Sequence, residues 1–118
     1  MIKNSIVLFP FPFDDFSASK VRPALCLTNE IGKYSHVIIA FISSKIPEDL
    51  IESDIIINKQ SDINKTAGLT VDSVIRLHKV VTIPKSLIKR KLGTINKTIV
   101  SEVRNKISQL LDISDKIV

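Results

Sequence analysis

The stretch FPFPFDDFSASKVRPALCLTN, residues 9–29, decides the fold because it joins two short apolar runs through a long polar connection. The runs at residues 5–9 and 24–28 are rich in residues that favour strands, which predicts two buried strands. Pro23 lacks a backbone donor, so we expect it at the start of the second strand. A tight turn is enough for an ordinary hairpin, so a connection of this length indicates a loop with a function of its own.

The rest of the chain is also dominated by short strand patterns. Strands are expected at residues 36–43, 54–57, 73–83 and 92–95. The run at 36–43 is apolar on both faces, which is typical of a strand in the middle of a sheet. Prolines at positions 47 and 84 predict single helical turns at 47–50 and 84–87. Residues 58–68 are polar and end in Gly, so we expect a second long flexible loop there.

Only the C-terminal segment has a helical period. Its apolar residues recur at spacings of three and four and predict one buried face, made of Val100, Val103, Ile107, Leu110 and Leu111. Asn96 is the expected N-cap of this helix. The chain is therefore predicted to be mainly β with an α+β organisation. We expect a small, strongly bent antiparallel sheet or barrel with a C-terminal α-helix over one opening, in a single domain spanning residues 1–118.

The charge is distributed unevenly. The chain carries +5 overall: residues 1–31 carry no net charge, residues 32–64 carry −2, and residues 65–118 carry +7. The densest cationic cluster is Lys89-Arg90-Lys91. Such a surface attracts polyanions and steers them toward the protein. A lysine-rich composition also improves solubility, so the charge leaves nucleic-acid binding as one of two interpretations.

Several classes of protein are disfavoured. No run of about 18 apolar residues is present, so no membrane span is expected, and no signal-peptide cleavage site follows the N-terminus. The single cysteine, Cys26, lies in an apolar run and predicts a buried, unreactive thiol in a cytosolic protein. His36 and His78 stand alone, without a Cys/His metal set, and no glycine-rich phosphate loop is present. We expect no cofactor and no metal.

Polar residues gather at the ends of the predicted strands. Arg22 precedes the second strand, Ser43 closes the third, and residues 29–35 form the turn between these two strands. If the two strands pair as a hairpin, Arg22 and Ser43 lie at the same end. A guanidinium beside a hydroxyl can bind a phosphate and stabilise charge that develops on it. An arginine packed on Pro23 and a plain strand-end hydroxyl remain the alternative interpretation.

Several motifs in order resemble one known family. VLFPFPF at 7–13 and KVRPALCL at 20–27 are similar to the opening of the MazF/PemK (Kid) family of toxins from type II toxin–antitoxin systems. AGL at 67–69, DSVIRL at 72–77 and IKRKLGTI at 88–95 resemble the second half of that family. The resemblance covers nearly the whole chain.

The resemblance implies a fold like that of MazF and CcdB, an SH3-like bent sheet that is usually a homodimer. It also implies a cytoplasmic endoribonuclease that needs no metal and cuts single-stranded RNA at short sequences. In that chemistry the ribose 2′-hydroxyl attacks the adjacent phosphorus and leaves a 2′,3′-cyclic phosphate. The implied partners are single-stranded RNA and a small acidic antitoxin.

By position, the resemblance assigns the catalytic roles to Arg22 and Ser43. The expected contacts to substrate are Asp14, Asp15, Ser17, Ser19, Lys20, Ser44, Lys45, Asp72, Ser73 and Arg76. We expect the first loop to form a flexible wall over the substrate groove. The fixed φ of Pro23 would aim Arg22 into that groove.

Two departures from the family pattern bear on activity. Asn4-Ser5 stands where the family has Gly-Asp, and the first loop offers Asp14 and Asp15 instead of a glutamate, so the general base is not identified. Two other functions therefore stay open. One is a CcdB-like toxin that binds gyrase without cleaving RNA and does not need the Arg–hydroxyl pair. The other is an inactive RNA-binding module.

Overall fold

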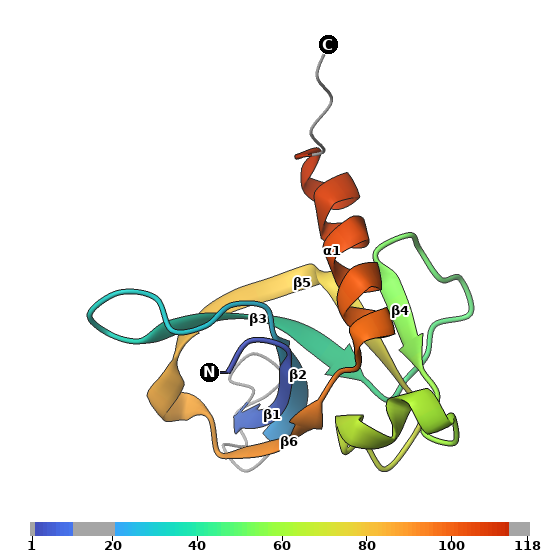
Figure 1. Ribbon diagram of the computed structural model, residues 1–118, viewed down its shortest axis with the longest axis horizontal. Helices are drawn as coiled ribbons and strands as arrows, with labels where there is room; N and C mark the ends of the chain where they lie inside the picture. The colour runs from blue at the N-terminus through green and yellow to red at the C-terminus, as the bar shows by residue number, and fades with distance from the viewer. Residues whose placement is uncertain (1, 11–20, 114–118) are drawn as a thin grey trace.

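A computed structural model describes residues 2–10 and 21–113, which form one six-stranded antiparallel sheet and a C-terminal α-helix (Figure 1). The strands are β1 (Ser5–Pro10), β2 (Val21–Cys26), β3 (His36–Ser43), β4 (Asp54–Ile57), β5 (Ser73–Pro84) and β6 (Arg90–Thr94). Their order across the sheet is β4-β5-β3-β2-β1-β6. The sheet curls into a half-barrel, and helix α1 (Lys97–Leu111) stands over it. The predicted fold class is confirmed.

The expected central strand is confirmed, because β3 pairs with β2 on one side and β5 on the other. The second strand begins at Val21, three residues earlier than predicted. Pro23 is tolerated inside β2 because the pairing with β3 begins only at Ala24. The side of Pro23 that faces β3 therefore lies at a strand edge, where no backbone donor is needed. Strand β6 likewise begins earlier than expected, at Arg90.

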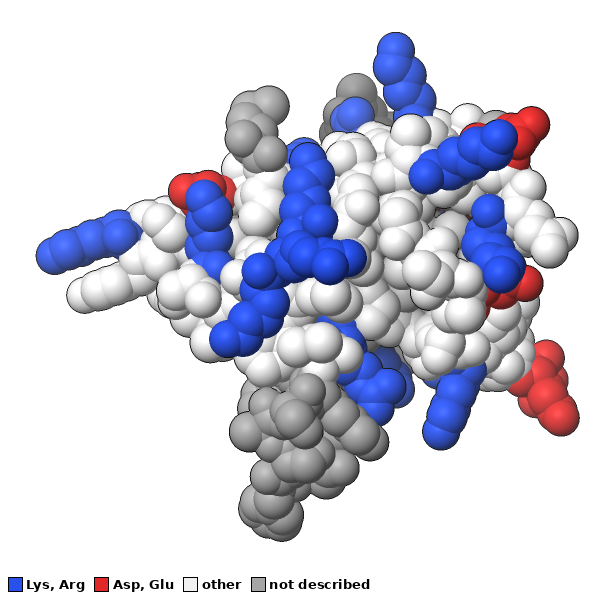
Figure 2. Space-filling view, turned by 90° about the horizontal axis from the view of Figure 1, so that it is seen from below, with Lys and Arg blue, Asp and Glu red and all other residues white. Residues whose placement is uncertain are grey.

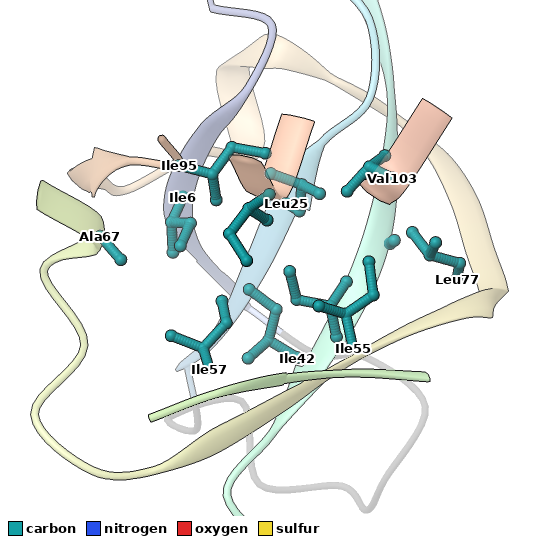
Figure 3. Close-up of a cluster of buried hydrophobic side chains, with 12 residues drawn as sticks. Ile6, Leu25, Ile42, Ile55, Ile57, Ala67, Leu77, Ile95 and Val103 are labelled. Atoms are coloured by element: carbon teal, nitrogen blue, oxygen red, sulfur yellow. The ribbon is translucent and has the colours of Figure 1, made fainter. Parts of the chain in front are cut away.

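Both faces of the sheet are covered by buried apolar side chains. Figure 3 shows the first core, to which Ile6, Leu25 and Ile75 contribute together with α1 residues. The second core lies on the other face and includes Phe9, Cys26 and Ile39. Cys26 has no exposed surface, and its burial raises the pKa of the thiol to about 11. The thiol therefore stays neutral at physiological pH, as predicted for an unreactive cysteine.

Helix α1 is capped as predicted, and the first part of its predicted apolar face, Val100, Val103 and Ile107, packs on the first core. The Asn96 side chain accepts the Ile99 backbone N–H at 2.9 Å, which stabilises the first turn. Ile99 and Val103 are the buried helix residues. Leu110 and Leu111 were expected to be buried, but they are 46% and 62% exposed. The reason is geometric, because the second half of the helix extends past the body of the sheet (Figure 1). No helix in the described part of the chain is long and apolar enough to span a membrane.

Two connections differ from expectation. Residues 47–50 form bends rather than the predicted helical turn, whereas Lys85–Leu87 does form a short 3₁₀ turn, η2, after Pro84. Most of the predicted flexible loop at 58–68 is instead an ordered 3₁₀ segment, η1 (Asp62–Ala67), against β6. The Thr66 hydroxyl donates to the Thr94 carbonyl at 2.9 Å, and Ala67 is buried. This packing fixes the chain that leads into β5.

Candidate active site

Four neighbouring strands present polar side chains on one face at one end of the sheet. Arg22 lies opposite Phe9, and Ala24 lies opposite Phe41, so Arg22 and Ser43 share a face beside one another. Phe41 in turn pairs with Arg76, and Arg76 pairs with a residue of β4, Asp54. The predicted placement of Arg22 and Ser43 at the same end of a hairpin agrees with this register.

Arg22, Ser43 and Arg76 line a cavity of about 250 Å³. Its lining residues are Arg22, Phe41, Ile42, Ser43, Lys45, Arg76 and Lys79. All the charged members of this set are cations, and Phe41 stacks on Phe9 with ring centroids 6.1 Å apart. On the face shown in Figure 2, Lys and Arg side chains are spread widely, and fewer Asp and Glu side chains lie among them. We call the cavity of about 250 Å³ lined by these seven residues the cationic cavity. It is suited to an anion such as a phosphodiester.

Arg76 is held in the cationic cavity by a buried carboxylate. Its Nε donates to Asp54 Oδ1 at 3.0 Å and its Nη2 to Asp54 Oδ2 at 3.5 Å. Asp54 Oδ2 also accepts the Ile51 backbone N–H at 3.1 Å. The Asp54 side chain has no exposed surface, whereas the Arg76 side chain is 21% exposed. The guanidinium is thus fixed along one edge.

The Ser43 hydroxyl is oriented by the chain that follows it. Its Oγ accepts the Lys45 backbone N–H at 3.0 Å and donates to the Lys45 carbonyl at 3.3 Å. The single O–H of Ser43 is used by the Lys45 carbonyl, so Ser43 can donate to a bound anion only when its hydroxyl rotates away from that carbonyl. The same turn places Lys45 beside the cavity.

A second cavity, of about 350 Å³, lies against the first core and also includes Arg22 in its lining. Leu69 and Leu92 form part of its apolar wall, and Ser44 and Arg90 are among its polar members. Ser73, expected to contact substrate, lines this cavity but is buried and donates to the Val71 carbonyl at 3.0 Å. The structure therefore separates Ser44 and Ser73 from the cationic cavity.

Of the remaining expected contacts, Asp72 does not line the cationic cavity, and the other five are outside the described part of the chain. Asp72 accepts the Lys59 backbone N–H at 2.9 Å, which holds the start of the 58–72 segment. Asp14, Asp15, Ser17, Ser19 and Lys20 lie outside the described residues. The loop predicted to cover the groove is therefore not placed by the structure.

Three residues were not predicted as site residues. Lys79 and Arg90 line the two cavities, and Asp54 holds Arg76 in place. Lys79 lines the cationic cavity because β5 carries a bulge: Ala40 pairs with Val80 but Phe41 with Arg76, leaving residues 77–79 without a partner in β3. Strand alternation alone would place residues 76 and 79 on opposite faces, so no pattern in the sequence indicated Lys79. Arg90 belonged to the cationic cluster noted in the sequence, and nothing in the sequence linked Asp54 to Arg76.

The two histidines lie away from the cationic cavity. His78 Nδ1 lies 2.9 Å from the hydroxyl of Ser53, which is buried. The ring centroids of His36 and Tyr34 are 6.0 Å apart. Within residues 2–10 and 21–113, no three His, Cys, Asp or Glu side chains gather in a way that could hold a metal ion.

Comparison with known proteins identifies the family. A model of the PemK-like, MazF-like toxins of type II toxin–antitoxin systems matches residues 3–111. The chain belongs to this PemK/MazF family. No curated protein sequence matches the chain significantly.

Solved structures of MazF toxins share the fold. The MazF of a MazE–MazF structure from Deinococcus radiodurans superposes with a TM-score of 0.72 at 18% identity, over 97% of both chains. A MazF toxin of Mycobacterium tuberculosis gives a TM-score of 0.69 at 20% identity, over 92% of this chain and 96% of that one. An endoribonuclease from Mycobacterial species, solved with its cognate antitoxin, superposes with a TM-score of 0.68 at 11% identity, over 96% of each chain.

Proposed function

We propose that this PemK/MazF toxin is an endoribonuclease that cleaves single-stranded RNA without a metal ion. The observation that carries the proposal is the cationic cavity, where Arg22 and Ser43 lie side by side with Arg76, Lys45 and Lys79. The likeness in fold to proteins described as endoribonucleases supports it. The +5 net charge favours a polyanionic substrate.

In the proposed reaction, the ribose 2′-oxygen forms a bond to phosphorus while its proton passes to a base. The bond from phosphorus to the 5′-oxygen then breaks, the 5′-oxygen takes up a proton, and a 2′,3′-cyclic phosphate remains. Negative charge accumulates on the equatorial phosphoryl oxygens. Arg22 would stabilise that charge with a planar, permanently charged fork. The Ser43 hydroxyl would rotate away from the Lys45 carbonyl and donate one neutral hydrogen bond. Asp14 and Asp15 are the proposed candidates for the base.

Cleavage of a long RNA in excess EDTA tests the proposal directly. We expect discrete fragments whose upstream ends carry a 2′,3′-cyclic phosphate and whose downstream ends carry a 5′-hydroxyl, as mapped by end-labelling. Activity that disappears with the chelator would contradict metal independence. Intact RNA, with the purified protein folded, would instead favour the gyrase-binding or inactive RNA-binding alternatives. Inhibition of gyrase and retention of labelled RNA on a filter distinguish those two.

We also propose a homodimer and an acidic antitoxin as the partners. Most apolar side chains of β1 and β3 belong to the two cores, so these strands are not the expected dimer surface. Three exposed apolar side chains, Val80, Leu110 and Leu111, line a cavity of about 620 Å³ between β5 and the second half of α1. Monomeric proteins rarely leave such a patch uncovered.

Light scattering at micromolar concentration should give twice the 13.2 kDa chain mass. Leu111→Glu should shift the protein toward the monomer, because a charge would have to be buried in the interface. Leu50→Glu changes a similarly exposed leucine away from that cavity and should leave the mass unchanged. A wild-type mass of one chain would contradict the dimer.

A further inference from the structure

We propose that Asp54 is a positioning residue for the RNA cleavage proposed above, on which this inference rests. It acts through Arg76, whose guanidinium it fixes at the wall of the cationic cavity. Asp54 itself has no exposed side-chain surface and does not line the cavity. It would therefore affect the reaction without touching the RNA.

The geometry separates Arg76 from the other cations of the cavity. Lys45 and Lys79 are exposed residues on flexible stems. Arg76, in contrast, is bonded through Nε and Nη2 to the two oxygens of one carboxylate. These bonds occupy one edge of the guanidinium and leave its Nη1 side for an anion in the cavity. A donor that is already oriented loses less conformational freedom when charge develops near it.

Asp54 is itself held in place. It begins β4 directly opposite Arg76 in the antiparallel ladder, and its Oδ2 accepts the Ile51 backbone N–H. Arg76 also pairs with Phe41 in β3, two residues from Ser43. The carboxylate thus ties the edge strand β4 to the part of the sheet that carries Arg22 and Ser43. Asparagine has the same shape and would keep the ladder, but it would lose the ion pair and one of the two oxygens that accept from Arg76.

The test compares Asp54→Asn, Arg76→Gln and the double variant in cleavage of a short RNA. Because hydrogen bonds to charged groups are stronger than those between neutral groups, Asp54→Asn should lower kcat by about tenfold. The change in KM should be smaller. Because Asp54 acts through Arg76, the double variant should be no slower than Arg76→Gln alone. Independent roles would instead multiply the two losses.

Two controls separate positioning from stability. Ile99→Val removes one buried methylene from α1, away from the cavity, and should lower the melting temperature without changing kcat. Glu30→Gln breaks the exposed ion pair with Lys85, whose Nζ lies 2.8 Å from Glu30 Oε1, and should also leave kcat unchanged. If Asp54→Asn destabilises the fold, assays well below its melting temperature keep the comparison valid.

The outcomes are distinguishable. An active wild type with an equally active, folded Asp54→Asn variant overturns the role of Asp54 and leaves the proposed function standing. Multiplicative losses in the double variant overturn the action through Arg76. A folded wild type that cleaves no RNA overturns the proposed function and the role of Asp54 with it.

Discussion

Arg22→Ala should slow single-turnover cleavage of a short RNA by about a hundredfold or more, the loss typical of removing one preorganised donor at a developing oxyanion. Arg22 lines the cationic cavity beside Ser43 and also lines the second cavity. Its position near the start of β2, where β3 pairing has not yet begun, should allow the fold to survive the change. Circular dichroism melts check that the variant is folded.

Three comparisons sharpen this result. Arg22→Lys should keep part of the RNA binding but recover little of the rate, because a point charge replaces a planar fork. Ser43→Ala should cost about tenfold, the value of one neutral hydrogen bond. Lys33→Ala removes an exposed cation from the 31–36 turn and should have no effect on the rate. A folded Arg22→Ala variant that cleaves at the wild-type rate would make the site assignment wrong, and Asp14, Asp15 and Asp72 would be tested next.

Gly93→Ala should produce a large loss of stability for the addition of a single methyl group. A Cβ at this position would lie 2.1 Å from the Thr66 carbonyl oxygen and 2.5 Å from the Ala67 carbonyl carbon. Both contacts are backbone, so β6 and η1 must separate. We expect the free energy of unfolding to fall by about 3 kcal/mol, the upper part of the range for overpacked sites, measured by urea denaturation.

Gly32→Ala is the matched control. Gly32 has a φ of +71°, but a Cβ there would meet no atom within 4 Å. Its cost should therefore be limited to the backbone strain of one left-handed residue, roughly 1 kcal/mol. Equal stability losses for the two variants would show that β6 and η1 can move apart at little cost in free energy, which would contradict the prediction.

Regular strands were the most predictable part of the fold. The bounds of β3 and β4 agree with the pattern of the sequence, because each is a short apolar run ended by polar residues. The 58–68 segment was not predictable, because its order depends on the close approach of Gly68 and Gly93 to backbone that is distant in sequence. The exposure of Leu110 depends in the same way on where the sheet ends beneath α1.

The candidate site was also predictable only where it depends on local sequence patterns. The neighbourhood of Arg22 and Ser43 follows from a local hairpin, so the sequence alone predicted it. The ion pair of Arg76 with Asp54 joins strands through a register that no local pattern encodes. Lys79 reaches the cavity only because of the bulge in β5, and a bulge breaks the alternation on which prediction from a strand pattern rests.

The first and last strands are neighbours in the sheet, with Ser5 opposite Thr94. The ordering entropy of the intervening chain must be lost before this pairing contributes anything, so such topologies fold more slowly than ones built from local contacts. During synthesis, β1 emerges first and lacks its outer neighbour until β6 has been made. The newly made chain therefore carries an open strand edge for most of its translation, the period in which it is most prone to pair with other chains.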